Sequence, residues 1–234
     1  MTLGDLIDQA RIRLDDLNAD FLNEEEDLIR FANNGVNEIC RRALLIKDSS
    51  TTEIVELVLA EDVKTYDLDD RILFIERAGY DGNRLKRIAL ERLDTIWNWE
   101  NISGSPNYFC TDYEDGKALI YPTPRLNEDG HIVKLTVYRL PLADMSSTSD
   151  VPEIPPEYHH GILYWMCYEA LRRQDIDLEA LQKSQAEYAA FEQLFGQPKN
   201  AAIFAVSRRR FPGDLVGTLV NSGETQAFST STKN

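Results

Sequence analysis

Cysteine is scarce in this chain of 234 residues, and its three copies are far apart. Cys40, Cys110 and Cys167 form no CxxC pair, which argues against a disulfide framework and against a cysteine-rich zinc site. A chain with so few thiols is typical of assembly in a reducing, intracellular compartment. We interpret Cys167 as a buried residue of an apolar helix.

Histidine is equally rare, and the spacing of its three copies does not match a metal site. His131 follows Asp129-Gly130 and is typical of a turn. His159 and His160 are adjacent at the start of a predicted helix, so their side chains point about 100° apart and cannot bind one metal as an i, i+4 pair would. The sequence contains no HExxH pattern. We therefore expect no metal and no cofactor.

Long apolar runs and familiar catalytic patterns are missing as well. The chain has no run of about eighteen apolar residues, so the sequence predicts no membrane-spanning helix and no membrane partner. Residues 1–10 contain Asp5 and Asp8 and do not resemble a secretory leader. The glycine-rich and serine patterns of nucleotide-binding and acyl-transfer proteins are absent. Carboxylates are numerous, but no pair stands out by its spacing, so we predict no catalytic residue, and a carboxylate-based hydrolase stays an open alternative.

Positive charge is in short supply. The chain has 25 Lys and Arg against 40 Asp and Glu, a net charge of −15. This balance disfavours a protein that grips nucleic acid, but it is compatible with a protein past which DNA slides without sticking. Residues 197–234 differ, with five basic side chains and two acidic ones, which leaves the preceding residues at about −18. A basic tail on an acidic body indicates docking of the tail on an acidic surface, such as that of a neighbouring copy.

Hydrophobic residues make up 43% of the chain, and their spacing predicts the fold class. Near both ends they recur every three or four positions, which is typical of helices with one buried face. Between the helical segments, residues 51–140 alternate and are rich in β-branched residues, which predicts strands. We predict an α+β fold, with a four-helix bundle, an inserted antiparallel β region and an extended C-terminal tail. The predicted helices are residues 3–18, 24–46, 157–173 and 176–195, and the predicted domains are 1–50 with 152–196, 51–151, and 197–234.

Local signals add detail to the β region. Asp81-Gly82-Asn83 and Glu114-Asp115-Gly116 predict two hairpin turns. Residues 53–60 are predicted as a strand, and residues 89–99 as a short helix with Trp97 on its apolar side. The aromatic residues of this region either form a ligand platform or fill a core between strand and helix, and we favour the core. They are Trp97, Trp99, Tyr108, Tyr113 and Tyr121.

Short motifs, in a fixed order, resemble those of tailed-phage head–tail adaptor (connector) proteins. The first is the pair of segments TLGDLIDQARIRLDDL and LIRFANNGVNEICRRALLI, with Asn33 or Asn34 followed by Glu38-Ile39. The others are Trp97, Gly104-Ser105-Pro106 with Tyr108, Gly116, Tyr121-Pro122-Thr123-Pro124, Tyr138-Arg139-Leu140-Pro141 and Ile154-Pro155-Pro156-Glu157-Tyr158-His159. The resemblance covers about residues 1–195.

The resemblance implies a structural virion protein of the neck rather than an enzyme, assembled in the host cytoplasm. Such adaptors form a ring, commonly of twelve subunits, beneath the portal. The C-terminal tail extends to the portal, the opposite face receives the tail tube or nozzle protein, and DNA passes without specificity through the lumen. Two alternatives are a neck stopper or tail-completion protein and, from another class, a tail-associated hydrolase.

Three sets of residues are candidates for these contacts. The portal-docking tail would use apolar islands and arginines, which suit an extended segment lying across a partner: Ile203, Phe204, Arg208, Arg209, Arg210, Phe211, Leu215 and Leu219. Subunit contacts would use basic residues that meet the excess acid of a neighbour: Arg41, Arg42, Arg172 and Arg173. The acidic run at the start of the second helix either complements the helix dipole, which we favour, or lines the lumen: Glu24, Glu25, Glu26 and Asp27.

Overall fold

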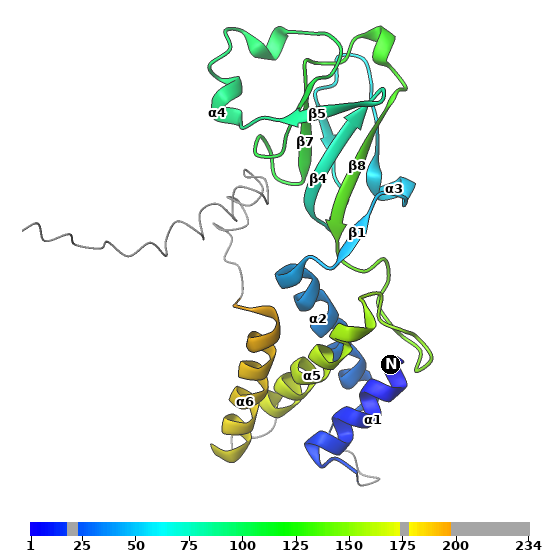
Figure 1. Ribbon diagram of the computed structural model, residues 1–234, viewed down its shortest axis with the longest axis vertical. Helices are drawn as coiled ribbons and strands as arrows, with labels where there is room; N and C mark the ends of the chain where they lie inside the picture. The colour runs from blue at the N-terminus through cyan, green and yellow to red at the C-terminus, as the bar shows by residue number, and fades with distance from the viewer. Residues whose placement is uncertain (18–22, 174–177, 198–234) are drawn as a thin grey trace, which may run out of the picture.

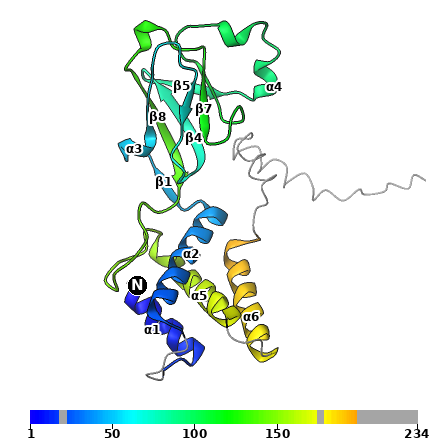
Figure 2. The same cartoon turned by 180° about the vertical axis from the view of Figure 1, so that it is seen from behind.

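The computed structural model describes residues 1–17, 23–173 and 178–197. A helical part and a sheet part lie end to end, and both the chain leaving the second helix and the chain leaving the last strand pass between them (Figure 1). Strand β1 (Ile46–Asp48) is the part of the sheet nearest the helices in both views (Figures 1 and 2). Within the described ranges, no helix is both long and apolar enough to cross a membrane.

Helix α5 (His159–Arg173) is the centre of the helical part. It packs against α1 (Leu3–Leu14), α2 (Glu25–Ala43) and α6 (Leu178–Phe195). Two glycines permit this close packing, because a Cβ at Gly35 would lie 3.2 Å from Trp165 and one at Gly161 would overlap the ring of Phe195. Helix α1 begins with a capping box between Thr2 and Asp5.

The prediction of a four-helix bundle with an antiparallel insertion is wrong. The largest unit is a curled, mixed sheet of eight strands that forms a half-barrel, and the short helices α3 (Thr52–Val55) and α4 (Leu90–Leu93) bring the α-helices of the described residues to six. Apolar spacing identifies which face of a helix is buried but not which element covers that face. Helix α5 packs against three helices at once. The sheet meanwhile encloses hydrophobic cores of its own.

The sheet is mixed because one of its strand pairs is parallel. Its order is β1-β8-β4-β5-β6-β7-β3, with β2 also paired to β8, and β5 runs parallel to β6. The chain between these two strands, residues 88–107, supplies the crossover that a parallel pair requires. The remaining strands are β2 (Glu56–Val58), β3 (Thr65–Asp67), β4 (Ile72–Tyr80), β5 (Asn83–Arg87), β6 (Tyr108–Cys110), β7 (Lys117–Tyr121) and β8 (Ile132–Arg139).

Both predicted hairpins are present. Strands β4 and β5 pair in antiparallel fashion with Tyr80 opposite Asn83, and β6 pairs in the same way with β7. Asp81 and Gly82 have φ values of 47° and 74°, both in the left-handed region. A two-residue hairpin turn needs this conformation to match the right-handed twist of its strands. Strand β8 alternates as predicted, with Val133, Leu135 and Val137 buried in the core.

Two local predictions in the β region are wrong. Residues 52–55 form helix α3 instead of the start of a strand, and the helix predicted over residues 89–99 ends at Leu93. Asn98 then takes a left-handed φ of 56°, which turns the chain, and the prediction that Trp97 lies on the apolar side of a helix is wrong. Trp97 is 89% exposed, whereas Trp99 is 7% exposed. The ring of Trp99 packs edge-on against Tyr113 and Tyr121.

Candidate functional site

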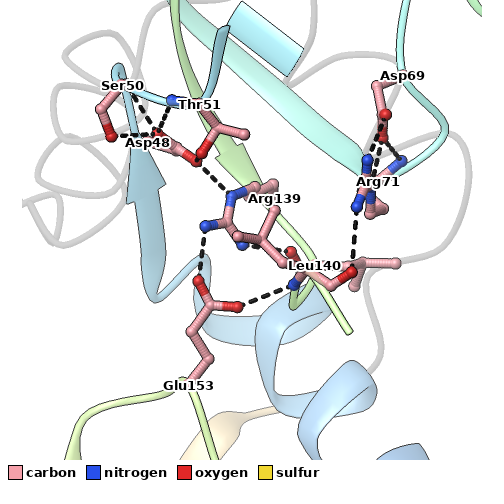
Figure 3. Close-up of polar contacts among 9 residues, drawn as sticks. Asp48, Ser50, Thr51, Asp69, Arg71, Arg139, Leu140 and Glu153 are labelled. Atoms are coloured by element: carbon pink, nitrogen blue, oxygen red, sulfur yellow. Dashed lines mark hydrogen bonds and ion pairs between the residues drawn. The ribbon is translucent and has the colours of Figure 1, made fainter. Parts of the chain in front are cut away.

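A network of charged side chains, buried at Arg139 and Asp48 and partly exposed at Glu153, connects the sheet part to the helical part (Figure 3). Arg139 ends strand β8, Asp48 ends β1, and Glu153 lies in the segment before α5. The Nε atom of Arg139 donates to Oδ2 of Asp48 at 2.6 Å, and its Nη2 donates to Oε1 of Glu153 at 2.6 Å. The side chains of Arg139 and Asp48 are 5% and 4% exposed. Charges this deeply buried are stable only when they are paired and hydrogen-bonded. We call Asp48, Arg139 and Glu153 together the joint.

Asp48 accepts further hydrogen bonds from the turn that follows β1. Its Oδ1 accepts from the backbone N of Ser50 at 2.8 Å and of Thr51 at 3.1 Å, and its Oδ2 accepts from the Thr51 hydroxyl at 2.7 Å. Burial by itself would raise the pKa of Asp48, but these hydrogen bonds and the one from Arg139 outweigh it and lower the pKa far below its ordinary value. Asp48 is therefore a carboxylate at neutral pH.

Glu153 also connects the joint to the start of the segment between β8 and α5. Its Oε2 accepts from the backbone N of Leu142 at 2.9 Å, and burial again opposes, but does not overcome, the lowering of its pKa by Arg139. Arg71, the residue immediately before β4, donates to the Leu142 carbonyl at 3.1 Å and to both carboxylate oxygens of Asp69. The start of β4 and the end of β8 are thus fixed to the same connecting segment.

The connecting segment, residues 140–158, is also fixed to the helices. The side-chain amide of Asn33 in α2 exchanges two hydrogen bonds of 2.9 Å with the backbone of Met145. The ring of His159, which is 1% exposed, lies 3.0 Å from the Ile154 carbonyl, and burial lowers its pKa. Asn33, Arg139 and His159 belong to three of the motifs that resemble head–tail adaptors. These motifs therefore supply side chains that fix one region of the structure, the connecting segment.

The arginines predicted for subunit contacts lie in different environments. Arg41 is exposed, and its Nη1 lies 4.0 Å from Oε2 of Glu38, a long distance for an ion pair. Arg172 is exposed and donates to the Tyr168 hydroxyl at 2.9 Å. Arg42 is buried inside the chain. It donates to Glu38 and to the Gly196 carbonyl, each at 2.7 Å. Arg173 is the last residue of α5, and its side chain is outside the described part of the structure.

The acidic run lies in the first turn of α2, at the end of that helix remote from the joint. Glu24, Glu25 and Glu26 are exposed, while Asp27 accepts a hydrogen bond from Arg30 at 2.7 Å. Carboxylates in this position complement the helix dipole, and three of them also face solvent. Their role in a lumen stays a prediction. The predicted portal-docking residues lie outside the described residues: Ile203, Phe204, Arg208, Arg209, Arg210, Phe211, Leu215 and Leu219.

The thiols and the imidazoles of the described residues have structural surroundings. Burial raises the pKa of Cys40, Cys110 and Cys167 to about 12, so all three are protonated at neutral pH. His131 lies 3.0 Å from the Tyr80 hydroxyl, and His160 is exposed. Among the residues with described placement, no group of three or more His, Cys, Asp or Glu could hold a metal ion.

Sequence reasoning did not find the joint. Arg139 lay within a motif, but its partners Asp48 and Glu153 are 91 and 14 residues away. One signal was available for Asp48, because an aspartate followed by Ser49-Ser50-Thr51 is typical of a side chain that binds its own turn. For Glu153 the sequence offers no comparable signal.

Comparison with known families gives one match. The model of a protein family described as SU10 adaptor protein matches residues 1–215, a range that includes both parts and the joint between them. No curated protein matches the chain.

Proposed function

Since the chain belongs to the SU10 adaptor protein family of phage structural proteins, we propose that it is a head–tail adaptor that assembles as a ring between the portal and the tail of a virion. Twelve copies are the common number in the adaptors that the sequence resembles. The family match over residues 1–215 is the observation that carries this proposal.

The joint supports the proposal physically. An adaptor has to hold one set of contacts at a fixed distance and angle from another. The Asp48–Arg139–Glu153 network is directional, because each hydrogen bond constrains both partners, and it connects the sheet to the segment that packs on the helices. We propose that this network serves to fix the geometry of the connection, since a buried ion pair often adds little net stability relative to apolar residues of similar volume.

The charge of the chain suits DNA passage. The residues before 197 carry about −18, so a lumen built from them repels phosphate instead of retaining it. The basic tail, residues 197–234, is proposed to dock on the portal, and the opposite face of the ring is proposed to receive the tail tube or nozzle protein. No observation favours the hydrolase alternative. Asp48, Asp69 and Glu153 have pKa values lowered by structural partners, whereas a general acid needs a raised pKa.

Electron microscopy of the full chain mixed with its cognate portal tests this function. We expect a ring coaxial with the portal and attached directly to it. A variant that ends at residue 197 is the matched control, and it should stay folded but fail to attach. Attachment only to a complex that already carries another adaptor would instead identify a neck stopper. Failure of the full chain to attach to either would overturn the proposal.

A further inference from the structure

One face of the sheet is basic although the chain as a whole is acidic. On strands β4, β5 and β8, the side chains that point away from the core include four exposed basic ones, which we call the basic face: Arg77, Arg84, Lys86 and Lys134. Gly79 is the cross-strand partner of both Lys134 and Arg84, so it lies between them. Two carboxylates of the described residues lie at this face, Glu56 of β2 at 3.5 Å from Lys134 and the exposed Asp81 of the turn between β4 and β5, so the basic side chains outnumber the acidic ones by four to two.

The basic face is hollowed where Gly79 lies. A groove of about 470 Å³ is lined by residues that include Arg77, Gly79, Lys134 and Thr136, with Asp81 as the one carboxylate among its described lining residues. A Cβ at Gly79 would meet only ordinary contacts, 3.5 Å from the Asn83 carbonyl oxygen, so the missing side chain leaves a shallow floor between two cations. Such a floor admits a short acidic side chain from outside.

A second surface of the same sheet has the opposite charge. Four exposed carboxylates lie at the β3 end, around β3 itself and the turn between β6 and β7, and we call them the acidic edge: Asp67, Asp70, Glu114 and Asp115. The backbone N of Leu68 donates to the Gly116 carbonyl at 2.8 Å, which holds the two segments together. A cavity of about 200 Å³ opens beside them and is lined by residues that include Asp70, Gly116 and Lys117. Lys117 pairs with Glu114 at 2.7 Å, so the acidic edge keeps an excess of three carboxylates over this cation.

The two surfaces of one copy lie on different parts of the sheet. In the sheet order, β6 and β7 separate β5, the strand of the basic face nearest to the acidic edge, from β3. The inner sides of β8 and β7 contribute to one hydrophobic core, through residues such as Val133 and Ile120, so their outer sides point apart. Two complementary surfaces that face apart on the same subunit are what a closed ring with head-to-tail contacts requires.

We propose that the basic face of one copy binds the acidic edge of a second copy, so that the sheet parts form the subunit contact of the ring. This inference rests on the proposed function, because it needs self-association. DNA is the other polyanion that a basic face could bind. The acidic charge of the chain and the small extent of the basic face favour a protein partner.

Exchange of charges between the two surfaces tests the contact in the full chain. The basic-face variant is Arg77→Glu with Lys134→Glu, and the acidic-edge variant is Asp70→Lys with Asp115→Lys. All four residues are exposed, so both variants should melt like the wild type. Each variant alone should form rings at least about tenfold less readily, by native mass spectrometry and by counting rings on portals. A mixture of the two should recover rings in which the variants alternate, because each reversed surface meets its complement.

Lys183→Glu is the matched control for the Lys134→Glu substitution in the basic-face variant. The two lysine side chains are 64% and 72% exposed, and each has one glutamate nearby, Glu179 or Glu56. The control should leave ring formation unchanged. Two results would overturn the inference while leaving the adaptor function intact. One is that each variant alone forms rings as readily as the wild type. The other is that the basic-face variant loses DNA binding but still forms rings. Absence of rings in the wild type, with and without portals, would overturn both.

Discussion

Arg139 Nε lies 2.6 Å from Asp48 Oδ2, and the two side chains are 5% and 4% exposed. The two residues are 91 positions apart in the chain and stand at the ends of adjacent strands. The same guanidinium reaches Glu153, so one cation neutralises two carboxylates where the sheet part meets the helical part (Figure 3). The stability and pH response of the protein should depend on this arrangement.

The first prediction concerns removal of the cation. Arg139→Met should destabilise the fold by about 3–5 kcal/mol, because it leaves the buried Asp48 carboxylate uncompensated and also removes the partner of the partly exposed Glu153. Urea unfolding measures this loss. The control is Arg41→Met, since Arg41 is exposed and 4.0 Å from Glu38, and its loss should be about 0–1 kcal/mol. Equal effects of the two substitutions would contradict the assigned role of the joint.

The second prediction concerns acid. The pKa of Asp48 is lowered in the folded state, whereas an unfolded aspartate has a pKa of about 3.9. As the pH falls, the unfolded chain therefore takes up the proton first. The stability that Asp48 provides is complete above about pH 5 and is lost as the pH falls below the unfolded value. Asp48→Asn should be less stable than the wild type at neutral pH, and the gap should narrow in acid. A gap that is constant with pH would contradict this reading of Asp48.

The sequence predicted those parts of the fold that depend on local pattern. Apolar spacing placed α1, α2, α5 and α6 within a few residues of their observed bounds, because each buries one face. Alternation likewise placed β8, and Asp81-Gly82 placed its hairpin turn, since few other residues take a left-handed φ there.

Features that depend on distant partners could not be predicted in the same way. The parallel pairing of β5 with β6 and the packing of α5 against three helices both join segments whose local patterns fit several arrangements. The joint is a further example, because nothing near Arg139 in sequence indicates that Asp48 is its partner. Arg42 was predicted as a subunit-contact residue from its charge, and the sequence did not indicate that it is buried within the chain, where its methylene groups and rigid fork lie beside rings.

The third prediction separates Arg42 from the exposed arginines. Its Nε donates to Glu38 at 2.7 Å, and its guanidinium lies 4.9 Å from the centre of the Phe191 ring. Arg42→Glu should destabilise the isolated chain by about 3–5 kcal/mol, because it buries a second negative charge beside Glu38. Arg172→Glu should change unfolding by no more than about 0.5 kcal/mol and act, if at all, on association. A stable, monomeric Arg42→Glu variant would show that Arg42 acts between subunits.

The last prediction uses the two tryptophans whose environments the sequence could not distinguish. Trp97 is 89% exposed, so Trp97→Ala should leave the free energy of unfolding within about 0.5 kcal/mol of the wild type. Trp99 is 7% exposed, and its Nε1 donates to Asp94 at 3.1 Å, so Trp99→Ala should cost about 3–5 kcal/mol through the cavity it leaves and the acceptor it deprives of a partner. Acrylamide quenching in a Trp165→Phe background gives a second readout, because the third tryptophan is partly exposed and would otherwise add to the quenched signal. In that background the quenchable part of the fluorescence should disappear in Trp97→Ala. A strongly quenched Trp97→Ala variant would then place Trp99 at the surface and contradict the packing of its ring on Tyr113 and Tyr121.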